Sequence, residues 1–158
     1  MSGTIPKAGD RAPAFTLPAY PDGKIRLSTF KGRRLVVYFY PKDNTEGCTL
    51  EARDFQRLLP DFERLGVTLL GVSPDSLESH AKFAKKLKLA FPLLSDVDHK
   101  VAEKYGLWVE KQLYGRKFWG VQRATFVIGA NGRIEHAWPK VRPKKHAEAV
   151  LEWLRGKG

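Results

Sequence analysis

The sequence contains a single cysteine, Cys48, in a setting that favours chemical reactivity. The run Leu35–Tyr40 before it is continuously apolar, β-branched and aromatic, which is typical of a buried strand. Pro41 ends this run, and a polar loop leads to an amphipathic helix predicted for Thr49–Leu59. Cys48 therefore falls where a helix begins, and the free amides and dipole of a helix N-terminus stabilise a thiolate. A thiolate in this position is a candidate nucleophile.

Two neighbours of Cys48 have side chains that suit such a site. Thr45 lies three residues earlier on the same tight loop, so its hydroxyl can reach the thiolate or an oxygen of a substrate. Pro41 has no N–H group and can shield the pocket from water. The same residues also fit a structural interpretation, in which a buried cysteine follows a threonine cap and a strand-ending proline. Spacing alone does not separate the two interpretations.

Length and composition exclude several classes of protein. With 158 residues, 42% hydrophobic and 28% charged, the chain is predicted to be one globular domain over residues 1–158. Its longest apolar runs are much shorter than the ~20 residues that span a bilayer. Met1–Thr4 shows no basic segment followed by an apolar one, so we expect no secretory signal. A membrane protein, a collagen-like fibre and a disulfide-rich secreted module are excluded.

The cysteine and histidine counts bear on metal sites and on the compartment. One cysteine cannot form an internal disulfide or a multi-thiolate zinc site. The four histidines show no close ligand spacing, so we expect neither a metal nor a cofactor. A lone thiol is typical of a reducing compartment, and we expect a cytoplasmic protein.

The net charge of +11 is unevenly distributed. Residues 80–158 contain 17 Lys and Arg against 7 Asp and Glu, whereas residues 1–79 are nearly balanced. A basic half can contact nucleic acid, or it can simply be a solvated face. The basic residues are scattered and lack regular aromatic interleaving, which favours the solvated face.

Further elements follow from periodicity and turn signals. Val67–Val72 is a second buried strand, and Asn131-Gly132 joins two strands predicted at Arg123–Gly129 and Arg133–Trp138. Pro60 is expected to break the first helix and start a second at Asp61–Leu65. The other predicted helices are one from Ser76 or Asp75 to Leu87, with Leu77, Ala81, Ala84 and Leu87 on one side, and a closing helix over Pro143–Arg155. The order predicts an α/β fold, a mixed central sheet with helices on both faces.

The segment around Cys48 resembles the active-site motif of the peroxiredoxins. Pro41-x-x-x-Thr45-x-x-Cys48 is similar to that motif, and the wider Tyr38–Ala52 segment resembles the bacterioferritin-comigratory, or Q-type, branch. The resemblance covers roughly residues 8–155 and continues in three further segments. These are Gly71-Val-Ser-Pro-Asp-Ser, Phe91-Pro-Leu-Leu-Ser-Asp and Tyr114–Gly129.

The resemblance implies a thioredoxin-like fold and a thiol-dependent reduction of hydrogen peroxide and organic hydroperoxides. Cys48 is then the nucleophile that becomes a sulfenic acid. Thr45 orients the peroxide, and the amides near Gly47 and Cys48 hold its oxygens. Arg123 matches the arginine of the family, which stabilises the thiolate and the leaving oxygen from a distant strand. Glu51 matches an acid that steers an arginine.

Aromatic residues form a further set of candidates. Trp119 is a candidate for the wall of the site beside Phe118, although aromatic residues in small domains usually serve packing. For Arg123 and Glu51 the alternatives are a charge at a strand edge and an exposed acid in the first turn of a helix.

The chain lacks the second cysteine that many Q-type proteins use to resolve the sulfenic acid. Arg53 and Ala84 occupy the two positions where that cysteine is found. The resemblance therefore indicates a one-cysteine mechanism with an external thiol, namely thioredoxin, glutaredoxin or glutathione. Basic residues near Arg116 suggest attraction of anionic thiols such as glutathione. We expect a monomer without membrane contact.

Two alternative functions make different predictions for Cys48. The first is a basic thioredoxin-like binding module that contacts nucleic acid and keeps Cys48 as a structural thiol. It predicts an unreactive cysteine and salt-dependent binding. The second, a disulfide-exchange protein, conflicts with the absence of a Cys-x-x-Cys motif.

Overall fold

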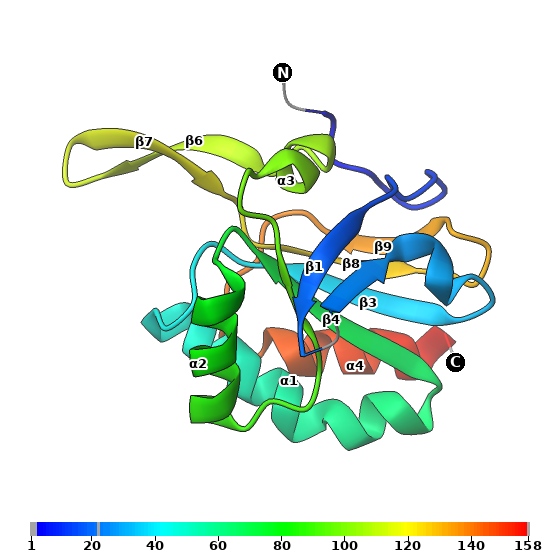
Figure 1. Cartoon of the computed structure of the whole chain (residues 1–158). Helices are drawn as coiled ribbons and strands as arrows, with labels where there is room; N and C mark the ends of the chain where they lie inside the picture. Colours follow the sequence, from blue (N-terminus) through cyan, green and yellow to red (C-terminus); the bar gives the residue numbers. More distant parts are fainter. Residues whose placement is uncertain (1–2, 22, 158) are drawn as a thin grey trace.

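A computed structural model describes residues 3–21 and 23–157 (Figure 1). Met1 and Ser2, which belong to the segment where we expect no secretory signal, lie outside this range. Seven strands form one sheet in the order β2-β1-β5-β4-β3-β8-β9, and β6 and β7 form a separate hairpin. The strands are β1 (Thr16–Tyr20), β2 (Gly23–Arg26), β3 (Arg34–Phe39), β4 (Val67–Ser73), β5 (Leu93–Ser95), β6 (Trp108–Leu113), β7 (Arg116–Val121), β8 (Ala124–Ile128) and β9 (Ile134–Trp138).

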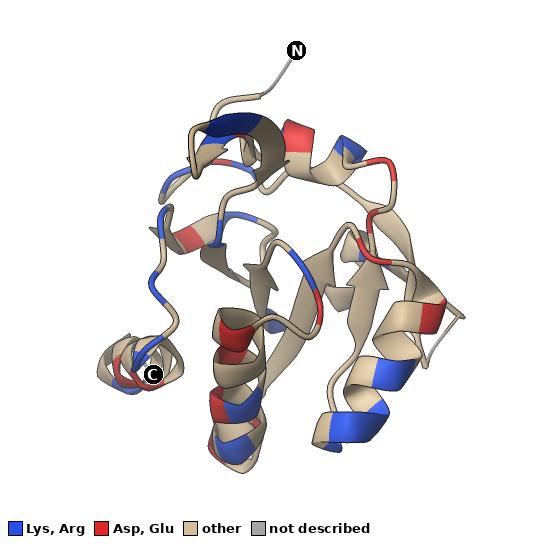
Figure 2. Ribbon diagram, turned by 90° about the vertical axis from the view of Figure 1, so that its left-hand side faces the viewer, with Lys and Arg blue, Asp and Glu red and all other residues tan. Residues whose placement is uncertain are grey.

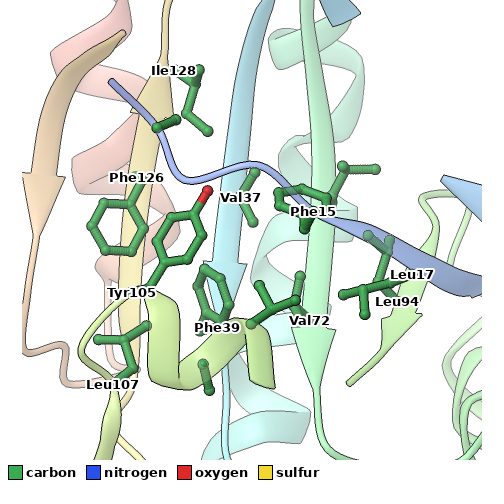
Figure 3. Close-up of a cluster of buried hydrophobic side chains, with 14 of the residues drawn as sticks. Phe15, Leu17, Val37, Phe39, Val72, Leu94, Tyr105, Leu107, Phe126 and Ile128 are labelled. Carbon is green, nitrogen blue, oxygen red and sulfur yellow. The ribbon is translucent and has the colours of Figure 1, made fainter. Parts of the chain in front are cut away.

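Strand β3 lies near the middle of the sheet because its side chains are apolar on both faces. It runs parallel to β4 and antiparallel to β8. Leu35, Val37 and Phe39 belong to one hydrophobic core (Figure 3). Val36 and Tyr38 point to the other side and belong to a second core. The period of two along the strand thus fills both layers, as the uninterrupted apolar run predicts.

The helices cover the two faces unequally. Residues of α1, α2 and α4 contribute to the second core, so these three helices pack on one face (Figure 1). The other face is covered by α3, by the segment that follows it and by Ala12 and Phe15 of the segment before β1. The bounds are α1 Glu46–Arg64, α2 Leu77–Leu87, α3 Lys100–Lys104, α4 His146–Lys157 and a short 3-10 helix at Leu27–Phe30.

The predicted helix break at Pro60 is wrong, because α1 continues through this residue to Arg64. Proline removes one helical hydrogen bond, to the carbonyl of residue 56, and its ring lies on the exposed side of the helix. Leu59 and Phe62 are buried on either side of Pro60, so packing against the second core holds both halves of the helix in line. The apolar positions of this helix, Leu50, Phe55, Leu58 and Leu59, are predicted by their spacing to be buried, and Leu50 alone among these four is instead exposed.

Two other helices differ from prediction. The buried residues of α2 are His80, Phe83 and Ala84, whereas Leu77 is exposed. On the predicted side, Ala84 is buried and Leu87 packs against the second core, as expected. His80 joins the buried side because it contacts a buried carboxylate, as described below. The closing helix begins at His146 rather than at Pro143.

The β6–β7 hairpin was not predicted from the sequence and extends away from the sheet (Figure 1). Of its twelve strand residues, Val121 is the buried one. No helix within residues 3–21 and 23–157 is long and apolar enough to cross a membrane.

Candidate active site

Cys48 lies in the first turn of α1, directly after the loop that follows β3. Thr45 is the residue that precedes the helix, and the first intrahelical hydrogen bond runs from the amide of Thr49 to the carbonyl of Thr45. The amides of Gly47 and Cys48 precede that bond, so they are available to hold an anion or the oxygens of a substrate. The cysteine is free and only 1% exposed. Its thiol therefore meets small reactants in a desolvated environment.

Arg123 reaches Cys48 from the start of a neighbouring strand of the sheet. It precedes β8, whose first residue pairs with the last residue of β3, and this register brings Arg123 to the β3–α1 loop. One guanidinium nitrogen, Nη2, donates to the Cys48 Sγ at 3.2 Å. The other, Nη1, donates to Glu51 Oε1 at 2.6 Å. The fork of the guanidinium thus holds the sulfur and the carboxylate at once.

Glu51 is fully buried one helical turn after Cys48. Burial raises the pKa of Glu51 from 4.5 to about 7, although the charge of Arg123 acts in the opposite direction. Within the described residues, Glu51 Oε2 and the nearby Tyr38 hydroxyl have no hydrogen-bond partner. Burial and then the charge of Glu51 raise the pKa of Tyr38 well above its ordinary value. Cys48 and Arg123 therefore lie next to buried polar groups that are shielded from water.

The guanidinium of Arg123 is held in its charged form. Burial alone lowers its pKa, but the charges of Glu51 and Cys48 outweigh this effect, and the net pKa is raised. The positive charge next to Sγ is thus maintained at any working pH.

The space around Arg123 leaves little room for a larger residue at Gly47. A Cβ at this position would lie 3.2 Å from Arg123 Nη2 and 3.2 Å from Pro143 Cγ. The segment that contains Pro143 also contacts Arg123, because the Val141 amide donates a hydrogen bond to the Arg123 carbonyl at 3.0 Å. The loop between β9 and α4 therefore packs against the site.

Thr45 and Pro41 lie on the same loop as Cys48. The Thr45 hydroxyl donates to the Lys42 carbonyl at 3.1 Å, which leaves its oxygen lone pairs available to accept a hydrogen bond. Pro41 is partly buried and lines a pocket together with Arg123. Both positions agree with the predicted roles, which remain predictions.

A buried polar cluster holds the loop between β3 and α1 in place. Asp43 accepts hydrogen bonds from the Tyr40 hydroxyl at 2.6 Å and from the Ser79 hydroxyl at 2.8 Å. His80 Nδ1 contacts the same carboxylate at 2.7 Å, and the Asp43 amide donates to Asp75. One side-chain ligand atom from each of Asp43, Asp75 and His80 lies within 4.8 Å of the other two. Since protein groups already occupy the Asp43 carboxylate, we interpret the cluster as the anchor between α2 and the active-site loop.

Trp119 occupies a different environment. It lies on β7 opposite Glu110 and is 57% exposed. It does not belong to the lining of the pocket beside Arg123. Its predicted contact with substrate stays a prediction.

Sequence reasoning missed three residues near the site. Tyr38 is predicted only as part of a strand, yet the charge of Glu51 raises the pKa of its hydroxyl. His146 is buried against Thr125, and burial, followed by the charge of Arg123, lowers its pKa to about 4. Lys111 comes from the hairpin that was not predicted and lines the pocket beside Arg123. No local pattern reveals these residues, because each is brought to the site by tertiary packing.

Comparison with known proteins agrees with this geometry. The profile of the AhpC/TSA family matches residues 8–137, and the chain belongs to this family of peroxiredoxins. It is 42% identical to peroxiredoxin Bcp of Escherichia coli over 149 residues, which cover 94% of this chain and 96% of that protein. Peroxiredoxin Bcp of Bacillus subtilis is also 42% identical, over 93% of this chain and 94% of its own.

Solved structures give the same result. A structure of the Xanthomonas campestris bacterioferritin comigratory protein, studied for alkyl peroxide reduction, superposes with a TM-score of 0.88 at 40% identity. That match covers 95% of this chain and 98% of the Xanthomonas protein. The thioredoxin-like peroxiredoxin fold predicted from the motifs is confirmed, and the protein is a thiol peroxidase with one cysteine. The nucleic-acid-binding alternative finds no support.

Proposed function

We propose that Cys48 is the peroxidatic residue and that Arg123, Thr45 and the first amides of α1 form its catalytic machinery. The Cys48 thiolate attacks the terminal oxygen of a hydroperoxide, and the O–O bond breaks as the S–O bond forms. The products are a sulfenic acid on Cys48 and, after protonation, an alcohol or water. Arg123 stabilises the charge that moves from sulfur to the leaving oxygen.

The remaining residues position the reactants. The Thr45 hydroxyl accepts a hydrogen bond from the peroxide, and the Gly47 amide donates to the developing oxyanion. Pro41 keeps water from the pocket. Glu51 holds Arg123 in place through its second nitrogen. Trp119 lies on β7 outside the lining of the pocket, so it would contact only the outer part of a large substrate.

The sulfenic acid is resolved by an external thiol, because the chain has no other cysteine. A first thiolate attacks Cys48 Sγ to give a mixed disulfide and hydroxide. A second thiolate then releases the Cys48 thiolate and a disulfide of the reductant. Glutathione, glutaredoxin and thioredoxin are the candidate reductants of a monomeric cytoplasmic enzyme.

The observation that carries the proposal is the 3.2 Å contact between Arg123 Nη2 and Cys48 Sγ. It is tested by peroxide consumption with each of the three reductants, using the wild-type protein, Cys48→Ser and Arg123→Ala. Turnover with at least one reductant, lost in Cys48→Ser and strongly reduced in Arg123→Ala, supports the proposal. Equal peroxide consumption by wild type and Cys48→Ser refutes it.

A further inference from the structure

A pocket of about 350 Å³ opens beside the active site and has a basic lining. Pro41 and Arg123 are among its lining residues, and the Arg123 guanidinium connects it to the reactive sulfur. Lys111 of β6 and Lys140 of the loop before α4 contribute two further cations. The pocket is large enough for a small organic molecule.

The charges around the pocket are unbalanced. Glu110 is the acid in its lining, and this residue is exposed. Glu51 is buried behind the guanidinium and is already paired with Arg123. In the part of the chain that the structure describes, neither Lys111 nor Lys140 forms an ion pair. The two lysines are therefore available to a ligand.

The surroundings continue the positive charge. The loop from Pro139 to Lys145 carries Lys140, Arg142, Lys144 and Lys145 without an acidic residue. Figure 2 shows the side of the molecule toward which the β6–β7 hairpin extends. Lys and Arg residues, drawn in blue, lie on this hairpin and on the segment that leads into α4, the helix next to the label C. Such a surface raises the local concentration of anions and speeds their encounter with the site.

The charges of Arg123 and Cys48 both affect the pKa of Lys111. Burial and then the charge of Arg123 lower its pKa, while the charge of Cys48 acts in the opposite direction. Its ammonium group thus interacts with both partners of the catalytic contact. An anion bound between Lys111 and Lys140 would relieve the repulsion between Lys111 and Arg123.

We propose that this pocket, through Lys111 and Lys140, binds the carboxylate of a small acidic thiol that reduces oxidised Cys48. The inference rests on the proposed peroxidase function and specifies its second substrate. With the carboxylate held by the lysines, the thiolate of the same molecule attacks Cys48 Sγ, forming the mixed disulfide and displacing hydroxide. A second thiol molecule completes the reduction.

The first test uses reduced protein and does not depend on peroxide. Alkylation rates of Cys48 are measured with iodoacetate, which carries a carboxylate, and with iodoacetamide, which is neutral. The ratio of the two rates is expected to fall about three- to fivefold in Lys111→Gln and in Lys140→Gln, as for loss of one partly exposed ion pair. Lys117→Gln removes the same charge from an exposed hairpin position outside the pocket lining and should leave the ratio unchanged.

The second test uses Cys48 oxidised by one equivalent of hydrogen peroxide. Formation of the mixed disulfide is followed by intact mass with 3-mercaptopropionate and with 2-mercaptoethanol. The preference for the acidic thiol should fall in the same two variants and persist in Lys117→Gln. Added salt should reduce it in the wild type.

The outcomes separate the two proposals. If peroxide yields no sulfenic acid, the proposed function fails, while the alkylation ratios still decide whether an anion subsite exists. Equal ratios in all variants, or an equal loss in Lys117→Gln, overturn the subsite and leave the peroxidase intact. If the variants slow oxidation by a carboxylated hydroperoxide but keep the thiol preference, the pocket serves the peroxide and the inference is wrong.

Discussion

The pKa of Glu51 makes a quantitative prediction about stability. Because the buried carboxyl has a pKa of about 7 in the folded protein and 4.5 ordinarily, the folded state binds more protons between these values. Stability falls with rising pH wherever the folded state binds more protons than the unfolded state. At about 1.4 kcal/mol per pH unit, ionisation of Glu51 removes about 3 kcal/mol of unfolding free energy between pH 4.5 and pH 8.

The variant Glu51→Gln removes this ionisation and keeps an oxygen that can accept the Arg123 hydrogen bond. Urea unfolding of both proteins is measured from pH 4.5 to pH 8. The stability of the variant relative to wild type should rise by about 3 kcal/mol over this range, mostly below pH 7. Glu78→Gln, at a position 81% exposed, should show no such change. A pH-independent difference, or a variant that loses relative stability as pH rises, would refute the reasoning.

Three further predictions concern the contacts around Cys48. Arg123→Lys replaces the two nitrogens that hold Sγ and Glu51 Oε1 by one ammonium nitrogen without the planar fork, so the rate of sulfenic acid formation should fall about 10²-fold in stopped-flow measurements. Asp43→Ala leaves buried His80 Nδ1 and the Tyr40 hydroxyl without their partner and should cost about 1–3 kcal/mol for each in urea unfolding. Gly47→Ala places a Cβ against the guanidinium and should slow sulfenic acid formation about tenfold.

Matched controls distinguish these effects from general ones. Arg116→Lys changes an exposed arginine, Asp98→Asn changes an acid that is 63% exposed, and Gly156→Ala adds a Cβ with nothing within 4 Å. Each should leave its readout close to wild type. Wild-type rates in Arg123→Lys or Gly47→Ala would contradict the assigned geometry. A stability loss in Asp43→Ala no larger than in Asp98→Asn would contradict the anchoring cluster.

The parts of the site that lie close together in the chain were predictable from the sequence. The apolar run before Pro41 and the helix that follows place Cys48 at a helix start, and the structure has both elements. The pairing of Arg123 with this loop depends on the register of β8 against β3, which no local pattern encodes. That residue was selected through the resemblance to a family.

Other features depend on packing and were therefore missed. Pro60 favours a break, but buried neighbours on both sides hold the helix together. The burial of His80 on α2 follows from its contact with Asp43, a residue far apart in the chain. The β6–β7 hairpin has few buried residues, so it lacks the apolar alternation that marks the strands of the sheet.

The most direct measurement is the intact mass of reduced protein after one equivalent of hydrogen peroxide, with and without a sulfenic-acid trap. We predict rapid gain of one oxygen atom and a trapped adduct that peptide mapping locates at Cys48, with both greatly slowed in Arg123→Ala. A reaction no faster than that of free cysteine, or one unaffected by the loss of Arg123, would contradict the central claim that this arginine–cysteine contact performs the peroxidase chemistry.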